Sequence, residues 1–346
     1  MGLIVDAVVL SHWRGLLYLV KLRNEVNMSQ AKTALVTGGA GFIGSHLVDR
    51  LLTEGYRVVI VDDLSTGKLK NLNPAATFHH TDITHPSVQE VFSRERPDLV
   101  FHLAAQISVS ESTKDPVNDS EINVIGTLRL LEAARRCGVD KFIYSSTGGA
   151  LYGDPQVNPC TEQAPIVPLS PYALSKYLSE QYVELYHRLY HLNYTILRYG
   201  NVYGPRQDPH GEAGVVAIFA QAMLEGRQPQ IFGTGDQERD FVYVGDVVDA
   251  NILAIDRGDN DAFNIGTGEG TSVNRIFELL QNITNYKWDA TRRSPRQGEV
   301  YKISLECSKA HQGLKWSPKV NLEEGLQQTV EFFRKSPRPQ HSFAPD

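Results

Sequence analysis

Tyr172 and Lys176 form a pair of side chains whose types and spacing could move a proton to or from a substrate. They lie four residues apart in the segment YALSK, a spacing that places both side chains on one face of a helix. An unperturbed tyrosine has a pKa near ~10 and is a poor base at neutral pH, but a nearby ammonium group stabilises its phenolate form. In the alternative interpretation, Tyr172 is a buried aromatic residue and Lys176 is a solvated residue of the helix surface.

A hydroxyl group could join this pair from the segment that comes before it. The apolar run at 141–145 (KFIYS) predicts a buried strand, which leads directly into Ser146 and Thr147. Either side chain could donate a hydrogen bond to the oxygen atom that exchanges its proton with Tyr172. The residues alone leave the choice between the two open.

Three glycines follow the first predicted strand, 33–37 (TALVT). Gly38, Gly41 and Gly44 lie in the segment TGGAGFIG, which separates this strand from a helical pattern at 42–52. Glycine permits a tight turn and lets the backbone approach a pyrophosphate, and the helix N-terminus offers free N–H groups to the phosphates. The alternative, a glycine-rich turn without a ligand, is disfavoured by the acidic residues that end the next strand.

The second predicted strand, 57–62 (RVVIVD), ends in Asp62 and is followed by Asp63. A carboxylate about 20 residues after the glycine turn can bind the diol of an adenosine ribose. The same negative charge repels a 2′-phosphate, and the next three residues contain no arginine that would accept one. The sequence therefore predicts NAD rather than NADP as the cofactor.

Alternating strands and helices must position these groups. Apolar strands without polar alternation predict a parallel sheet with helices on both faces, which is a doubly wound α/β fold of the Rossmann type. Six such strands are predicted, at 33–37, 57–62, 77–80, 98–103, 141–145 and 194–199.

The domain boundaries follow from this pattern. Residues 31–200 are assigned to an NAD-binding domain, to which the chain returns in part near 240–265, and residues 201–335 mainly to a smaller, mixed substrate-binding domain. We expect residues 1–30 to be an extension outside the fold, with a short peripheral helix as the alternative, and residues 336–346 to be a flexible tail.

The bulk composition excludes several other classes of function. With 41% hydrophobic and 21% charged residues, the 346-residue chain is typical of a soluble globular protein. Its net charge of −6 gives no general attraction to nucleic acid or to an anionic membrane, and no apolar run is long enough to span a bilayer. The three cysteines lack metal-ligand spacing and fit a reducing compartment, so we expect a cytoplasmic protein without a metal site.

Together these motifs resemble the extended short-chain dehydrogenase/reductase family, from about residue 33 to about residue 333. Several segments are similar to UDP-glucose 4-epimerases in particular: TGGAGFIGSHLVD, VDDLSTG, FHLAAQ, SSTGGALYGD, SPYALSK, LRYGNVYGPRQDP and RDFVYVGDV. The resemblance implies an NAD cofactor and the epimerisation of a UDP-sugar at C4, with UDP-glucose and UDP-galactose or their N-acetyl forms as substrates.

The resemblance also assigns roles to individual residues. The cofactor would be held at its pyrophosphate by Gly38, Gly41, Phe42, Ile43 and Gly44, at its adenosine by Asp62, Asp63, Asp82 and Ile83, and along the rest of the dinucleotide by Leu103, Ala104, Ala105, Gln106, Asn123, Tyr172, Lys176 and Tyr199. The sugar nucleotide would be bound by Thr147, Tyr172, Asn201, Arg206, Val216, Arg239, Arg296 and Glu299. Arginine suits this role because its guanidinium group matches phosphate bidentately.

The sequence departs from the family pattern in two places. The segment SSTGGALYG is one residue longer than the commoner form, so either Ser146 or Thr147 could hold the position of the catalytic hydroxyl, and we favour Thr147. Gly200 stands where many relatives have phenylalanine, from which we expect a looser wall beside the nicotinamide.

In the reaction that the resemblance implies, Tyr172 removes the proton of the sugar C4 hydroxyl while NAD takes hydride from C4. The transient 4-keto sugar then rotates to present its other face, and the hydride and the proton return to it. Sugar 4,6-dehydratases and UDP-glucuronate decarboxylases are alternatives, but their pattern has an acidic residue directly after the catalytic hydroxyl, where this chain has Gly148 and Gly149. A non-catalytic NAD-binding protein is a third alternative, which would be marked by loss of Tyr172 or Lys176.

Two further expectations follow from the resemblance. Relatives pair two helices across a two-fold axis, so we expect a homodimer. Its interface is expected on the helices at 122–137 and 172–192, from Ile122, Val124, Leu128, Leu131, Ala134, Leu178, Val183 and Leu185. By alignment, Ile303 stands where relatives limit the space beside the sugar C2 substituent, and it either sets the substrate breadth or is a core residue away from the sugar.

Overall fold

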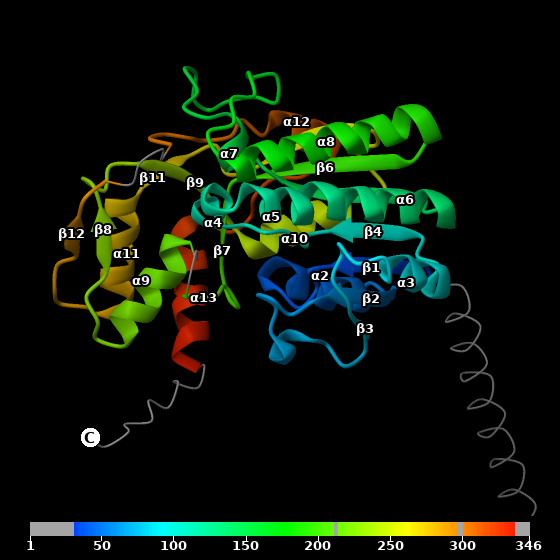
Figure 1. Cartoon of the computed structure of the whole chain (residues 1–346). Helices are drawn as coiled ribbons and strands as arrows, with labels where there is room; N and C mark the ends of the chain where they lie inside the picture. The colour runs from blue at the N-terminus through cyan, green and yellow to red at the C-terminus, as the bar shows by residue number, and fades with distance from the viewer. Residues whose placement is uncertain (1–30, 211–213, 296–299, 336–346) are drawn as a thin grey trace, which may run out of the picture.

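A computed structural model describes residues 31–210, 214–295 and 300–335 of the chain (Figure 1). Arg296 and Glu299, two of the residues assigned to the substrate, lie outside this part of the chain, as do the expected N-terminal extension and C-terminal tail. The expectations for these residues stay predictions.

A seven-stranded sheet forms the larger part of the molecule (Figure 1). Its strand order is β10-β6-β5-β4-β1-β2-β3, and every neighbouring pair is parallel. The strands are β1 (Thr33–Thr37), β2 (Arg57–Asp62), β3 (Thr77–His80), β4 (Leu99–His102), β5 (Lys141–Thr147), β6 (Asn193–Tyr199) and β10 (Asp261–Ile265). The predicted fold class is confirmed, and all six predicted strands are present.

Helices pack on both faces of this sheet (Figure 1). The longer ones are α2 (Phe42–Thr53), α3 (Val88–Glu95), α6 (Thr127–Cys137), α8 (Pro171–Tyr190) and α10 (Val244–Leu253). The shorter ones are η1 (Leu69–Asn71), α4 (Val109–Lys114), α5 (Pro116–Ser120), η2 (Glu121–Gly126), α7 (Gly148–Leu151) and α12 (Ser308–Gly313).

The apolar sequence of the strands follows from this double cover. Successive side chains of a strand point to opposite faces of the sheet. In β1, Ala34 and Val36 pack in a core cluster with residues of α2 and α10, whereas Leu35 packs in a second cluster with residues of α3, α6 and α8. Because both faces are buried, the segment TALVT shows no polar alternation.

A smaller, mixed part of the fold follows β6 in the sequence. It contains a three-stranded sheet in the order β11-β9-β7 and a two-stranded sheet of β12 and β8. Its elements are β7 (Asn201–Tyr203), α9 (Val215–Leu224), β8 (Gln230–Phe232), β9 (Glu238–Tyr243), β11 (Gly270–Ser272), α11 (Val273–Thr284), β12 (Thr291–Arg293) and α13 (Leu322–Lys335). The helices α9, α11 and α13 pack around a third apolar core that includes Phe219, Ile276 and Val330. None of the described helices is long and apolar enough to cross a membrane.

The predicted helix at 122–137 is divided into two elements. Residues 121–126 form a π-helical turn, η2, and the regular helix α6 begins at Thr127. A Cβ atom at Gly126 would lie 2.8 Å from Cδ1 of Ile83, so this glycine lets η2 approach the loop after β3. Such π-helical turns are frequent at functional sites, and η2 carries Asn123.

The surface predicted for a dimer is only partly exposed. Leu131 and Ala134 are 0% exposed and Val183 is 1% exposed, because these sides of α6 and α8 pack against the large sheet. Their assignment to an interface between two chains is therefore wrong. Exposed apolar side chains of this region include Val117, Ile125, Leu174 and Leu178.

Candidate active site

The predicted cofactor residues lie at the carboxyl ends of neighbouring parallel strands. The glycine turn follows β1, Asp62 ends β2, and the segment 103–106 follows β4. Because β4, β1 and β2 are adjacent and parallel, these three segments meet along one edge of the sheet. Ligands of open α/β sheets bind at this edge.

The glycine turn is folded so tightly that side chains are excluded from it. Gly38 has φ +70°, and a Cβ atom there would lie 2.8 Å from the backbone nitrogen of Ala104. A Cβ atom at Gly44 would lie 2.1 Å from the carbonyl oxygen of Gly38. The turn therefore brings bare backbone, including the N-terminal amides of α2 with Phe42 and Ile43, to the edge of the sheet.

Asp62 connects the glycine turn to the end of β2. One of its oxygens accepts the backbone N–H of Ala40 at 2.9 Å, and the other accepts that of Leu64 at 2.8 Å. Burial raises the pKa of Asp62, whereas these two hydrogen bonds lower it. Asp63 is exposed and accepts hydrogen bonds from the backbone and hydroxyl groups of Ser65.

Asp82 and Ile83, the two residues predicted to flank the adenine, differ in their exposure to solvent. Asp82 is exposed and accepts the backbone N–H of Thr84 at 2.7 Å. Ile83 is buried and lies against Gly126 of η2. Ile83 can therefore line a binding site only through the part of its surface that this packing leaves free.

The segment that follows β4 is joined to η2 by a reciprocal pair of hydrogen bonds. The backbone N–H of Gln106 donates to Oδ1 of Asn123, and Nδ2 of Asn123 donates to the carbonyl oxygen of Gln106, both at 2.9 Å. Leu103 and Ala104 donate their backbone N–H groups to the Thr37 hydroxyl at 3.2 Å. The structure thus brings the ends of β1 and β4 and the π-helical turn together, with Ala105 between them.

Tyr172 and Lys176 occupy the first two turns of α8. The Ser170 side chain caps this helix by accepting the backbone N–H of Ala173, and Pro171 takes its first position. Lys176 is buried, and its Nζ lies 4.4 Å from the centre of the Tyr144 ring. Burial lowers the pKa of Lys176 to about 7.

The pKa of Tyr172 differs from the expectation. Burial and the negative charge of Asp119 raise the pKa of Tyr172 to about 12, whereas a hydrogen bond with Thr147 acts in the opposite direction. The expected lowering by Lys176 is not found, and the loss of hydration on burial is the largest cause of the shift. In the protein alone, Tyr172 is therefore a protonated phenol at neutral pH.

Of the two candidate hydroxyl groups, the structure joins Thr147 to Tyr172. Thr147 ends β5, and its hydroxyl group lowers the pKa of the Tyr172 phenol, whereas Ser146 does not act on it. Ser146 is 4% exposed, and its hydroxyl has no hydrogen-bond partner among the described residues. Neighbouring side chains of a strand point to opposite faces, which explains why only one of the two meets α8 here.

The wall after β6 is filled rather than loose. The Tyr199 hydroxyl is buried between the side chains of Ser145, at 3.0 Å, and Asn251, at 2.8 Å. A Cβ atom at Gly200 would lie 2.7 Å from the carbonyl oxygen of Asp240. The expectation of extra space at Gly200 is wrong, because the backbone of β9 occupies the volume that a larger residue would take.

The predicted substrate residues are spread over the smaller part of the fold. Asn201 begins β7, and its Oδ1 would lie 3.1 Å from a Cβ atom at Gly149, so it faces the segment after Thr147. Arg239 on β9 donates hydrogen bonds to the carbonyl oxygens of Glu238 and Tyr301. Val216 is 0% exposed within the third core, so only its backbone N–H, in the first turn of α9, could reach a ligand.

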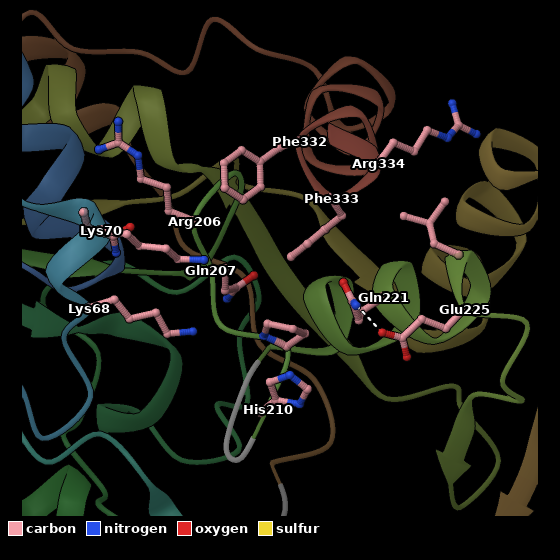
Figure 2. Close-up of a pocket in the computed structure, with 13 residues that line it drawn as sticks. Lys68, Lys70, Arg206, Gln207, His210, Gln221, Glu225, Phe332, Phe333 and Arg334 are labelled. Carbon is pink, nitrogen blue, oxygen red and sulfur yellow. Dashed lines mark hydrogen bonds between the residues drawn. The ribbon is translucent and has the colours of Figure 1, made fainter. Parts of the chain in front are cut away.

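Arg206 forms an ion pair with the larger part of the fold. Its guanidinium group binds Asp49 of α2 at 2.7 Å, at the edge of a pocket between η1 on one side and α9 and α13 on the other (Figure 2). Lys68 and His210 line the same pocket, and Lys68 forms an ion pair with Asp208. In this structure Arg206 therefore joins the two parts of the protein.

Ile303 belongs to a small apolar cluster. It is 2% exposed and packs with Tyr152, Cys160 and Leu305. This burial supports the second interpretation, in which Ile303 is a core residue and not a gate for the sugar. Within residues 31–210, 214–295 and 300–335, no group of three or more His, Cys, Asp or Glu side chains could hold a metal ion.

Asp119 is a neighbour of the site that the sequence did not reveal. It is 0% exposed and hydrogen-bonds Gln106 and Asn123, and its charge acts on both Tyr172 and Lys176. In the sequence it ends the segment DPVND, four residues after Asp115, which caps α5. Its only signal is its position four residues before Asn123, which a helical turn places on the same face.

Over most of its length the chain is similar to UDP-glucose 4-epimerases and, at 36% identity, to a dTDP-D-glucose 4,6-dehydratase of Mus musculus. Residues 34–266 match the model of the NAD dependent epimerase/dehydratase family. A UDP-glucose 4-epimerase of Mycolicibacterium smegmatis is 46% identical over 306 residues, which cover 87% of this chain and 98% of that protein.

Solved structures agree with this similarity. A UDP-glucose 4-epimerase with UDP-glucose from Thermotoga maritima has a TM-score of 0.87 and 54% identity, covering 88% of this chain and 99% of that one. The Thermus thermophilus UDP-glucose 4-epimerase in complex with NAD has a TM-score of 0.85 and 43% identity, with the same coverage of the two chains.

Proposed function

Because this chain belongs to the NAD-dependent epimerase/dehydratase family, we propose that it interconverts UDP-sugars by inverting the configuration at C4. The observation that carries this proposal is the arrangement at one edge of the sheet. Thr147 ends β5, Tyr172 and the buried Lys176 begin α8, and the glycine turn follows β1 at the same edge of the sheet. UDP-glucose and UDP-galactose are the proposed substrate pair.

The residues at the sheet edge fit an NAD molecule. The glycine turn excludes side chains at Gly38 and Gly44 and leaves backbone amides for the pyrophosphate. Each Asp62 oxygen already accepts one backbone N–H, and an ionised carboxylate has roughly four acceptor sites, so lone pairs remain for the ribose diol. NAD bound there would accept hydride from C4 and return it, and the positive charge of its oxidised ring would lower the pKa of Tyr172.

The protein side chains then have distinct tasks. Tyr172 takes the proton of the C4 hydroxyl and later returns it to the same oxygen, while Thr147 donates a hydrogen bond to that oxygen. Lys176, when protonated, favours the phenolate form of Tyr172 during this exchange. The net reaction consumes no second substrate, because the proton and the hydride both return to the sugar.

The structure adds an argument against a dehydratase. Expulsion of a C6 hydroxyl needs a general acid, which the alternatives carry directly after the catalytic hydroxyl. A Cβ atom at Gly148 would lie 2.6 Å from the Leu305 side chain and 3.2 Å from the carbonyl oxygen of Arg198. An acidic side chain at Gly148 would therefore need its surroundings to move.

The proposal is tested by incubating the purified protein with a panel of UDP-sugars and separating the products by chromatography. We expect UDP-glucose to yield UDP-galactose, and UDP-galactose to yield UDP-glucose, without added reductant. Formation of a 4-keto-6-deoxy sugar would instead identify a dehydratase, and loss of carbon dioxide from UDP-glucuronate would identify a decarboxylase.

We further propose a preference for NAD over NADP. A 2′-phosphate would approach the Asp62 carboxylate, which is fixed in place by its two backbone hydrogen bonds. We expect the Kd for NAD to be at least about tenfold lower than that for NADP, a difference of about 1.4 kcal/mol. Titration calorimetry on cofactor-free protein measures both constants, and equal affinities would contradict the role given to Asp62.

A homodimer is also proposed. Val117, Ile125, Leu174 and Leu178 are between 41% and 68% exposed, and they lie on α5, η2 and α8, which pack side by side. An exposed apolar surface on packed helices is typical of a site where a second protein surface binds. Two copies related by a two-fold axis could cover this surface on each other.

Replacing Leu178 with glutamate is expected to give a monomer. The substitution places a charge in the proposed apolar contact, where burial of an unpaired carboxylate is unfavourable. Light scattering at micromolar concentration should show a dimer for the wild type and a monomer for Leu178→Glu. Val157→Glu is the matched control, since Val157 is 73% exposed but lies in the loop between α7 and α8, and it should stay dimeric. A monomeric wild type would refute the proposal.

A further inference from the structure

His102 is a buried histidine at the end of β4 that the proposed reaction does not use. It is 1% exposed, and the centre of its ring lies 5.9 Å from that of Phe142 and 5.5 Å from that of Tyr144. Both of its ring nitrogens are bonded: Nδ1 lies 2.8 Å from the Thr37 hydroxyl, and Nε2 lies 2.9 Å from the Thr127 hydroxyl. His102 therefore connects the last residue of β1 with the first residue of α6.

The position of the ring proton follows from the partners of the two hydroxyl groups. A hydroxyl group has one hydrogen atom to donate and two lone pairs that accept. Thr127 donates its hydrogen atom to the carbonyl oxygen of Asn123, at 2.6 Å, so it can only accept a hydrogen bond from His102. Nε2 of His102 therefore carries a proton and donates it to Thr127.

On the other side of the ring, the Thr37 hydroxyl is the donor. Its oxygen accepts the backbone N–H groups of Leu103 and Ala104, both at 3.2 Å, which use its two lone pairs. Its hydrogen atom is then left for Nδ1 of His102, and a second ring proton at Nδ1 would have no acceptor. Burial lowers the pKa of His102 well below its ordinary value, and the charge of Lys176 on α8 acts in the same direction. The ring is therefore neutral.

This chain of hydrogen bonds anchors both ends of the segment 103–106, which follows β4. At its start, two backbone N–H groups of the segment donate to Thr37. At its end, Gln106 exchanges two hydrogen bonds with Asn123 of η2. His102 connects Thr37 with the carbonyl group of Asn123 through a single further hydroxyl, so it links the two anchors to each other.

We propose that His102 is a positioning residue of the cofactor site, which holds the glycine turn, the segment 103–106 and η2 in one arrangement as a neutral ring protonated at Nε2. Thr37 directly precedes Gly38, so a displaced Thr37 also moves the backbone of the glycine turn. The effect on NAD rests on the proposed function of these segments. The position of the ring proton, in contrast, is a property of the protein without a ligand.

NMR of protein labelled with nitrogen-15 at its histidines tests the position of the proton. The chain has 11 histidines, so the His102 signals are assigned by their absence in His102→Asn, whose side-chain oxygen can accept the Thr37 hydroxyl in place of Nδ1. We expect a neutral ring with its proton on Nε2, unchanged between about pH 8 and about pH 5.5, although an unperturbed histidine titrates near ~6.5. A proton on Nδ1, or titration within this range, would overturn the proposal.

The Kd for NAD separates the positioning of the cofactor site from a role in stability alone. His102→Leu removes both hydrogen bonds and should raise this Kd about tenfold, which corresponds to the loss of about one buried hydrogen bond. His79→Leu is the matched control, because His79 belongs to β3 of the same sheet and its ring bonds Glu95 at 3.0 Å. Both variants should unfold at lower urea concentration, but His79→Leu should keep the wild-type Kd.

Titration calorimetry on cofactor-free protein measures these constants, and circular dichroism checks that each variant is folded. If His102→Leu is unfolded, Thr127→Val, which removes the partner of Nε2, is measured in its place, with an expected increase in Kd of about threefold. An unchanged Kd in the folded variant, or an equal increase in His79→Leu, would overturn the proposal. The expected tautomer and Kd values in a protein that converts no UDP-sugar would refute the proposed function and support the inference on His102.

Discussion

Replacing Tyr172 with phenylalanine is expected to lower kcat for C4 epimerisation about a thousandfold. The substitution removes the hydroxyl that exchanges its proton with the sugar, and it keeps the aromatic ring and therefore the packing of the first turn of α8. Thr147 keeps its hydroxyl group but loses the phenol whose pKa it lowers. The variant then has no phenol at this position, so the proton transfer has no equivalent replacement.

The measurement is steady-state conversion of UDP-galactose to UDP-glucose, together with the Kd for NAD. Tyr182→Phe is the matched control, since it removes a hydroxyl from the same helix at a distance from Thr147, and its kcat should stay within about twofold of the wild type. The Kd for NAD should be similar in all three proteins. A Tyr172→Phe variant that keeps more than a tenth of the wild-type kcat would exclude Tyr172 as the proton carrier.

The second large effect is expected for Gly38→Ala, which should weaken NAD binding at least about a hundredfold, or about 2.7 kcal/mol. The new Cβ atom would lie 2.8–3.1 Å from backbone atoms of Ala104 and Leu103, which cannot move aside independently of β4. Relief of this contact separates the glycine turn from the end of β4. Both segments are proposed to hold the dinucleotide, so their separation displaces the amides that face the pyrophosphate.

Gly138→Ala is the control for the backbone conformation. Gly138 has φ +72°, almost the same as Gly38, but no atom lies within 4 Å of its added Cβ. The left-handed backbone should therefore lower the free energy of unfolding by about 1–2 kcal/mol in Gly138→Ala, and Gly38→Ala should lose more because its Cβ atom also meets the backbone of Ala104. Only Gly38→Ala should change the Kd for NAD, measured by titration calorimetry, and an equal loss in both variants would contradict this account.

The strands and the glycine turn are predictable from the sequence because their signals are local. β1 and β2 are short apolar runs, and the turn needs glycines at fixed positions in the chain. The same holds for the juxtaposition of Tyr172 and Lys176, which follows from helical spacing alone. Parallel pairing of adjacent strands then brings these local features together at one edge of the sheet.

The direction of a side chain within its element is not predictable in the same way. Leu131 and Val183 have the apolar character of interface residues, but the sheet covers their side of the helix. The burial of Val216 and the ion pair between Arg206 and Asp49 likewise depend on which distant segment packs against each residue. Hydrophobicity and charge in one sequence specify that a residue is apolar or cationic, not what it contacts.

The electrostatics of the site are the least predictable part. Helical spacing predicts that Lys176 lowers the pKa of Tyr172, but burial raises it and lowers the pKa of Lys176 itself. These shifts depend on the hydration that each group loses in the fold, and on Asp119, which stands far from α8 in the sequence. Only the packing of α5 against α8 brings this charge to the site.

The central claim, a reversible hydride transfer at C4 on this protein, is tested most directly with UDP-glucose carrying deuterium at C4. The proposed mechanism predicts that UDP-galactose forms and keeps the deuterium at C4, because the hydride leaves and returns without exchange with water, and that Tyr172→Phe forms it about a thousandfold more slowly. Absence of UDP-galactose, or its formation with loss of the deuterium to water, would contradict the mechanism.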